Sequence, residues 1–410
     1  MRRDGTPPPV LRRALVVARM SAVSRRLVAL VLPILLGAAG AAYGQATGLV
    51  QEAVDEQLRL LDTSGLDAFL AGLDEEVRRQ LPAGSVRELL LDPTGGLRLD
   101  PVGLARDWLQ YLWAEVIVQS RLLTQLVVVA ILCALMQHVA GSLSRSATDF
   151  GFLVAYMVVV YLGLRSFTLA SRIGRETLSD MSGLMLALLP LLSTMLAAVG
   201  ALSSAALFHP LLITAVTLVA SIVDRVVLPL LLLAAVVGVV GHMVTEFPLS
   251  KLAGLLRHGA VTVLGLAFTV FLGVMAVRGA IAPVADGVAL RATKFLAGAV
   301  VPVVGGMMAD AVEVVVGGSL LVKNALGALG LMALLVTLAF PLAKIGALVV
   351  IYRVATALVQ PISDVRLVDA LGTMADTLTV LAAAVATAAV MFFVAILVVI
   401  GVGNLTAVVR

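Results

Sequence analysis

The feature that most constrains this chain is its set of long apolar runs. Residues 380–403 hold no charged side chain and exceed the roughly 20 residues with which an α-helix crosses a bilayer. The 410-residue chain is 61% hydrophobic and 13% charged, with a mean hydropathy of +1.09. Soluble domains are about 45–50% apolar and about 25% charged. The sequence therefore predicts an all-α, polytopic integral membrane protein.

We expect about seven or eight transmembrane helices, together with a broken or re-entrant element. The alanines of residues 381–390 would let the last span pack closely against other helices, and Asp224 with Arg225 predicts a short turn between two spans. The candidate spans are 122–140, 150–168, 181–202, 205–223, 226–245, 259–277, 325–351 (interrupted at Pro341) and 380–403.

The segment 165–180 does not fit this count. It carries Arg165, Arg172 and Arg175, and arginines in short loops normally mark the cytoplasmic side. If the N-terminal signal described next is cleaved, the count places this loop outside. Either the loop is an interfacial helix held by protein, or one span is miscounted.

Two segments precede the membrane domain of residues 122–410. Residues 1–44 contain a basic stretch, an apolar run and small residues before Gln45, which is typical of a signal peptide, the alternative being an uncleaved anchor helix. Translation would start at Met1 or Met20. Residues 45–121 carry thirteen acidic residues against seven arginines. They predict an extracytoplasmic, amphipathic helical segment that begins a helix near Ser64 and needs a partner surface. Trp108, Tyr111 and Trp113 would form an aromatic belt.

Residues 282–327 hold most of the polar side chains of the apolar half. An ionised carboxylate at bilayer depth costs about 2.5–3.5 kcal/mol, so Asp310 and Glu313, which share one face of a helix, should face protein or water. The candidate pore or inter-subunit residues are Asp286, Arg291, Lys294, Asp310, Glu313, Lys323 and Asn324, with Arg291, Lys294 and Lys323 as counter-charges. The candidate helix-break residues are Pro302, Gly305, Gly306, Gly317 and Gly318. The alternative is an extramembrane amphipathic segment with solvated carboxylates.

The sequence gives no support to an enzyme. It contains no G-x-x-x-x-G-K-[ST], H-E-x-x-H or G-x-S-x-G motif, and we expect no catalytic residue, cofactor or metal. His242 and Glu246 are four residues apart, as two metal ligands on a helix would be, but no third ligand lies nearby in the sequence. We expect His209 to be a hydrogen-bonded residue at a helix end. The single cysteine, Cys133, lies within an apolar run, so we expect its thiol to be buried and unreactive. The basic residues are scattered, which does not favour a nucleic-acid partner.

Several long phrases, among them "SAALFHPLL" and "FPLAKIGALVVIYRVATALVQPISDVRLVDAL", resemble the stage III sporulation protein AE family over roughly residues 180–400. The resemblance implies a non-enzymatic membrane subunit of a secretion-like channel complex that links mother cell and forespore. It implies the mother-cell-derived membrane around the forespore as location. It also implies partners: other stage III sporulation A-operon membrane proteins including a separate ATPase, a forespore-side channel partner, and membrane lipid. The alternative function is a self-sufficient secondary transporter of an ion or small solute.

Overall fold

The computed structural model describes residues 57, 61–72, 101–139, 145–243, 249–300 and 304–408, and all of its regular elements are helices. The signal-peptide prediction for residues 1–44 lies outside this part. The helices are α3 (Ser64–Gly72), α7 (Pro101–Val118), α8 (Ser120–Val139), α9 (Arg145–Ala198), α10 (Leu202–Ile222), the π-helical η1 (Val223–Val227), α11 (Leu228–Gly241), α12 (Ser250–Val300), α13 (Val304–Val359) and α14 (Val365–Val408).

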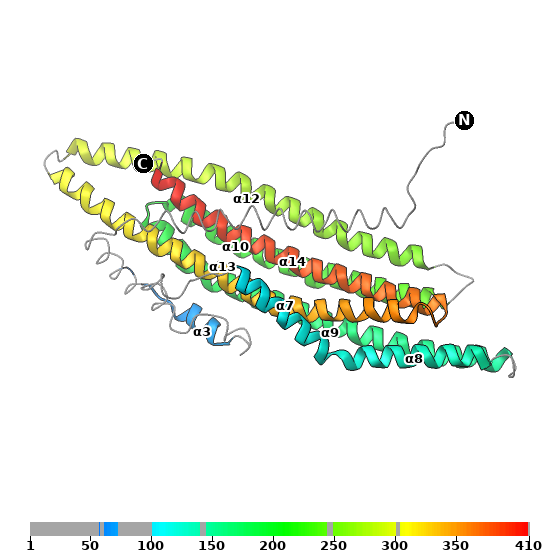
Figure 1. Cartoon of the computed structure of the whole chain (residues 1–410). Coiled ribbons are helices and arrows are strands. Elements are labelled where there is room, and N and C mark those ends of the chain that lie inside the picture. The colour runs from blue at the N-terminus through cyan, green and yellow to red at the C-terminus, as the bar shows by residue number, and fades with distance from the viewer. Residues whose placement is uncertain are drawn as a thin grey trace, which may run out of the picture.

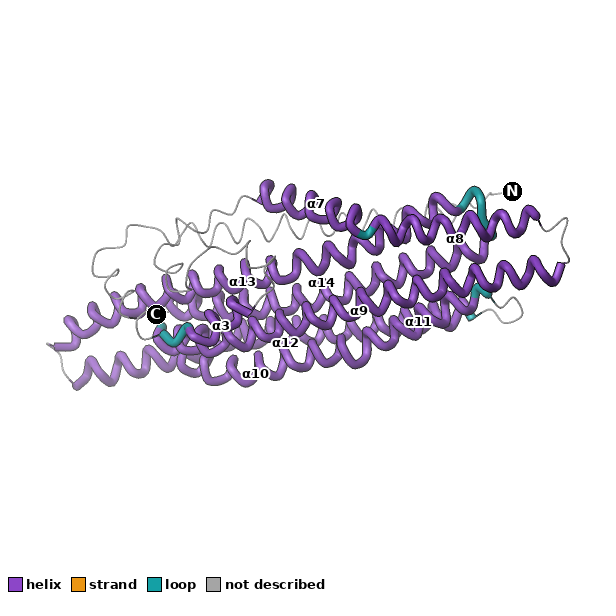
Figure 2. The backbone as a smooth tube through the Cα atoms, turned by 90° about the horizontal axis from the view of Figure 1, so that it is seen from below, coloured by secondary structure: helices purple, strands orange, loops and turns teal. Residues whose placement is uncertain are grey.

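The long helices run up and down along one elongated bundle, as Figures 1 and 2 show. Helix α14 lies inside the bundle and packs against α9, α11, α12 and α13. Its alanines Ala384 and Ala388 are fully buried next to Phe392, because side chains of this size let helix backbones approach closely. The prediction that this last span is a packing helix is confirmed.

Five helices in the described part are long and apolar enough to cross a membrane, and a bent pair makes a sixth if it counts as one span. The bent pair is Arg106–Val118 with Ser120–Leu135, at an angle of 46°. The five are Phe150–Ala198, Leu202–Gly241, Ser250–Val288, Val315–Val359 and Val365–Asn404. The expected seven or eight spans are therefore not found, because two pairs of predicted spans are single helical rods.

The first of these rods is α9, which joins the predicted spans 150–168 and 181–202. Residues 165–180 continue the helix, which favours the second of the two alternatives, a miscounted span. Charged side chains along it have partners: Arg172 Nε lies 3.0 Å from Glu176 Oε1, and Arg175 Nε lies 2.7 Å from Asp224 Oδ1 on the neighbouring rod. Because these arginines are paired with carboxylates, their charge does not require the helix to end in this segment.

The second rod is α10–η1–α11. The predicted turn at Asp224 and Arg225 is wrong, because both residues lie in the π-helical turn Val223–Val227, inside an otherwise continuous helix. Such a turn accommodates an extra residue without ending the helix. Val223 and Val227 at its two ends are buried.

The helix break expected between residues 302 and 318 does not occur in the described residues of α13. This helix runs without interruption from Val304 through Gly305, Gly306, Gly317 and Gly318, and also through Pro341. Pro302 lies outside the described residues. Each glycine costs a helix about 1 kcal/mol relative to alanine, but tertiary packing offsets this near Gly318. Next to it, Ser319 is fully buried, its hydroxyl donates to the Val315 carbonyl, and it accepts a bond from Gln57 Nε2.

The described parts of residues 45–121 pack on the long helices. Helix α3 begins at Ser64 as predicted, buries Leu66 and contacts α9, where the ring of Phe69 lies over Gly183. Trp108 and Tyr111 on α7 contact α13: Trp108 Nε1 donates to the Ala339 carbonyl at 2.8 Å, and Tyr111 stacks edge-on against Phe340. These two aromatic residues therefore contact protein, while Trp113 is 55% exposed.

Candidate functional site: buried charges at the ends of two helices

Asp286 on α12 is the first buried charge, with 1% of its surface exposed. Its Oδ1 accepts bonds from the backbone N–H groups of Ser203 (3.0 Å) and Ser204 (3.3 Å), and its Oδ2 accepts from the Ser204 hydroxyl. These groups form the first turn of α10, whose N-cap residue Ala201 offers no side-chain bond. The carboxylate therefore caps a helix remote in sequence, at the end where the helix dipole is positive.

The chain reaches this cap through a tight turn. Gly200, with a φ of 90°, is the positive-φ residue of the described chain, and it lies between the end of α9 and the start of α10. Glycine adopts this conformation without a steric penalty. After this turn, the free N–H groups at the start of α10 face α12, where they donate hydrogen bonds to Asp286.

Lys323 on α13 is the second buried charge, with 0% of its surface exposed. Its Nζ donates to the Ile400 carbonyl at 2.8 Å and to Asn404 Oδ1 at 3.0 Å, both in the last turns of α14. A Cβ on Gly403 would overlap this ammonium group, so the glycine makes the room. Ile400 lies eight residues before the end of α14, so its carbonyl lies within the helix and is not one of the free carbonyls at its C-terminus. Lys323 therefore binds the side of α14, whereas Asp286 caps the start of α10.

These contacts change the expected charge pairing. Because α13 is continuous, Lys323 lies ten residues from Glu313 on one helix, a rise of about 15 Å. A salt bridge within the helix is excluded at that separation, so Lys323 is not the counter-charge that the sequence suggested for Glu313. The side chains of Arg291, Lys294, Asp310 and Glu313 lie outside the described part of the structure. Asn324 is half-buried, and no partner for its buried Oδ1 occurs among the described residues.

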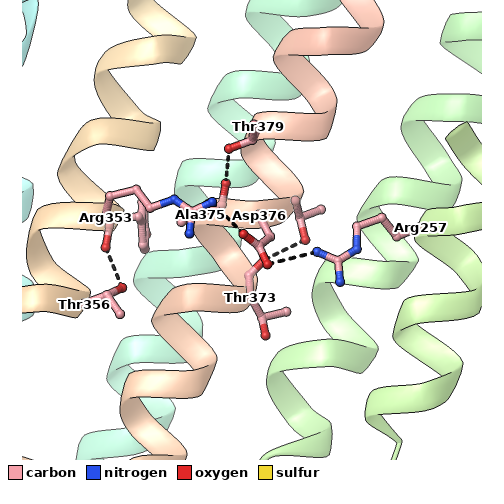
Figure 3. A network of polar contacts seen from close by, with 9 residues as sticks. Arg257, Arg353, Thr356, Thr373, Ala375, Asp376 and Thr379 are labelled. Carbon is pink, nitrogen blue, oxygen red and sulfur yellow. Dashed lines mark hydrogen bonds and ion pairs between the residues drawn. The ribbon is translucent and has the colours of Figure 1, made fainter. Parts of the chain in front are cut away.

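An ion network that the sequence analysis missed joins three long helices (Figure 3). Asp376 on α14 pairs through Oδ1 with Arg353 Nη2 of α13 at 2.7 Å, and through Oδ2 with Arg257 Nη1 of α12 at 3.3 Å. The three side chains are between 33% and 55% exposed. The available signal was a charged residue within a largely apolar stretch of each helix, but the sequence does not reveal which of these residues meet.

The remaining polar candidates have local partners. His209 lies within α10, and its Nδ1 is 3.2 Å from the Ser193 hydroxyl of α9. His242 Nδ1 bonds the Gly238 carbonyl, while Glu246 lies outside the described residues. The described part contains no group of three or more metal-ligating side chains. Cys133 is free and fully buried.

Comparison with known proteins assigns the family. The sequence profile described as stage III sporulation protein AE matches residues 85–403. The chain belongs to this family. It is also 33% identical to the stage III sporulation protein AE of Bacillus subtilis (strain 168) over 388 residues, which cover 92% of this chain and 97% of the relative. No solved structure shows significant similarity.

The stage III sporulation protein AE match covers the five long apolar helices up to residue 403 and includes Asp286 and Lys323. The predicted family resemblance is thereby confirmed, and the chain is a helical membrane protein of a sporulation family. Chemically, the buried charges bind backbone groups and an amide. In this arrangement they fasten α10 to α12 and α14 to α13.

Proposed function

We propose that this protein is a non-enzymatic, polytopic subunit of a secretion-like channel complex between mother cell and forespore, required for forespore development after engulfment. The similarity to a sporulation protein of nearly equal length supports this proposal, since it covers 97% of the relative. The proposed location is the mother-cell-derived membrane around the forespore. The family match supports the sporulation role, and the channel function is the additional part of this proposal.

The proposed partners are other stage III sporulation A-operon membrane proteins, including a separate ATPase, and a forespore-side channel protein. A separate energy source is part of the proposal because the sequence lacks a G-x-x-x-x-G-K-[ST] phosphate loop. The apolar outer surface of α12 supports an assembly embedded in lipid or against other subunits. Its exposed large residues include Leu255, Leu266, Val277 and Val288.

A self-sufficient transporter receives less support. Such a protein would use intramembrane charges such as Asp286 and Lys323 to bind its substrate or protons. Both side chains are instead buried and hydrogen-bonded to neighbouring helices. Releasing Asp286 for a substrate would leave the buried Ser204 N–H without an acceptor, at about 1–3 kcal/mol, and releasing Lys323 would cost its ammonium group both acceptors.

The decisive experiment replaces the stage III sporulation protein AE of Bacillus subtilis with a tagged copy of this chain. We expect heat-resistant spores to form, and we expect the tagged chain to copurify with an ATPase and other membrane proteins of the operon. Solute flux across liposomes that contain this chain alone, without copurifying proteins, would contradict the proposal and support a transporter.

The same strain tests the predicted role of Asp310 and Glu313. We expect the Asp310→Ala, Glu313→Ala double variant to reach the membrane at the wild-type level but to lose most heat-resistant spores, because the proposal places these carboxylates at a pore or subunit contact. Asp369→Ala, which removes an exposed carboxylate of α14, is the matched control. Normal spore counts in the double variant would remove this role from the pair.

A further inference from the structure

A groove between α8 and α9 combines two features that belong together in a lipid site. Its volume is about 570 Å³, and its lining includes Arg121 and Thr124 of α8, and Tyr161 and Arg165 of α9. The rest of its wall is mostly apolar, with Val128, Val158 and Leu162. No function discussed above uses this groove.

The two arginines are chemically available. Of the three arginines in residues 165–180, Arg172 and Arg175 form ion pairs with Glu176 and Asp224. For the side chains of Arg165 and Arg121, the described part of the chain supplies no carboxylate partner, and both side chains are exposed. Two guanidinium groups in one groove are thus left to bind an anion, and guanidinium is well suited to phosphate.

The groove is polar at one end and apolar at the other. Arg121 precedes Val128 by seven residues on α8, and Val158 precedes Arg165 by seven residues on α9, a rise of about 10 Å on each helix. Since α8 and α9 form a hairpin (Figure 1), the two arginines lie at the same end and the two valines at the other. A lipid headgroup at the arginine end of the groove would place an acyl chain along the valine end.

The height of the arginines in the bundle agrees with a headgroup position. The Tyr352 hydroxyl of α13 donates to the Leu162 carbonyl and the Ser166 hydroxyl of α9. This contact brings Arg165 level with Arg353, which belongs to the partly exposed Asp376 network. A layer of partly exposed charge across otherwise apolar helices is typical of the membrane–water interface, where arginines reach phosphates.

We propose that this groove binds a negatively charged phospholipid, with its phosphate between Arg121 and Arg165 and an acyl chain along Val128, Val158 and Leu162. The occupant is an amphiphile because a small anion would leave the apolar wall exposed. A zwitterionic lipid would bring its own cation towards the two guanidinium groups. The proposal does not depend on the sporulation channel.

The test uses the purified full-length protein in detergent, titrated with phosphatidylglycerol or with phosphatidylcholine of the same chains, and native mass spectrometry to count bound lipids. We expect tighter binding of phosphatidylglycerol. The Arg121→Gln, Arg165→Gln double variant should weaken that binding by about fivefold per arginine, roughly 25-fold in all. Phosphatidylcholine binding should stay unchanged. Millimolar inorganic phosphate should not displace the lipid.

Two further variants make the result decisive. Arg172→Gln removes an arginine of the same helix outside the groove and should leave lipid binding unchanged. Val158→Trp keeps both arginines but fills the apolar end, and it should also weaken phosphatidylglycerol binding. Equal affinity for the two lipids, no loss in the double variant, an equal loss in Arg172→Gln, or displacement by phosphate would each overturn the proposal.

Discussion

At the scale of single residues, Asp286 and Lys323 show how a membrane protein can keep a charge buried without a salt bridge. Asp286 caps the positive end of α10, and Lys323 donates to the Ile400 carbonyl and the Asn404 side chain of α14. The high cost of charge in an apolar environment was visible from the sequence, and it identified both residues as candidates for burial. Their partners were not visible, because they lie on helices about 80 residues away in the sequence.

The cap on α10 predicts a specific loss of stability. Asp286→Ala should destabilise the protein by about 2 kcal/mol, because the buried Ser204 N–H and hydroxyl would lose their acceptor and the Ser203 N–H would lose its cap. Asp286→Asn keeps an acceptor oxygen and should lose about half as much. Thermal unfolding of the purified protein in detergent measures both.

Asp369→Ala, at an exposed position of α14, is the control for this prediction and should leave the unfolding midpoint unchanged. A midpoint of Asp286→Ala equal to that of the wild type would show that the carboxylate does not stabilise α10. A midpoint of Asp286→Asn as low as that of Asp286→Ala would instead assign the whole effect to the charge.

At the scale of helices, charged side chains that appeared to end a span hold helices together. Arg175 and Asp224 connect α9 to the rod α10–η1–α11, and Asp376 connects α14 to α12 and α13. A sequence analysis that divides apolar runs at charges therefore predicts too many spans. The partner of each charge comes from a distant segment, and hydropathy along the chain cannot supply it.

The Asp376 network predicts a stability effect that depends on salt. Asp376→Asn leaves Arg257 and Arg353 facing a neutral side chain, which should destabilise the protein by about 1 kcal/mol at low ionic strength, since these groups are partly exposed. At 1 M NaCl, where the Debye length is about 3 Å, most of the loss should disappear. Thermal unfolding at the two salt concentrations measures the difference.

A loss of the same size at both salt concentrations would contradict the electrostatic explanation and assign the effect to packing. Asp369→Asn provides the control, because it removes one negative charge from the same helix at an exposed position. It should change the unfolding midpoint little at either concentration.

At the scale of the whole molecule, the helices are longer than a membrane requires. The five apolar helices contain 39 to 49 residues, whereas about 20 residues cross the hydrocarbon core. Part of each helix must therefore lie outside that core. The all-α membrane class was predictable from composition and run length, but the way these runs join into rods was not, because it depends on contacts between them.

Cysteine accessibility along α9 tests this arrangement. Arg172→Cys lies in the charged middle of the helix and should react with a membrane-impermeant maleimide from one side of the membrane. Val154→Cys, which replaces a side chain 50% exposed on the bundle surface, should be protected, because it lies on the same side of Arg165 as Val158, where lipid covers the apolar stretch. The native Cys133 is fully buried and should give no background.

Labelling at position 154 together with protection at position 172 would reverse the membrane depth inferred for α9. Reaction at both positions would place the whole of α9 in water, and this would contradict a spanning role for the helix.

The π-helical turn Val223–Val227 also determines which face each half of its rod turns inward. It bonds each N–H one residue further back than an α-helix does, and one residue corresponds to about 100° of rotation. The buried stripe of α10, which includes Phe208 and Leu212, is thereby brought into phase with the buried residues Leu231 and Ala235 of α11. If these same residues were α-helical throughout, composition and hydropathy would be unchanged, yet every side chain beyond residue 227 would be rotated by about 100°.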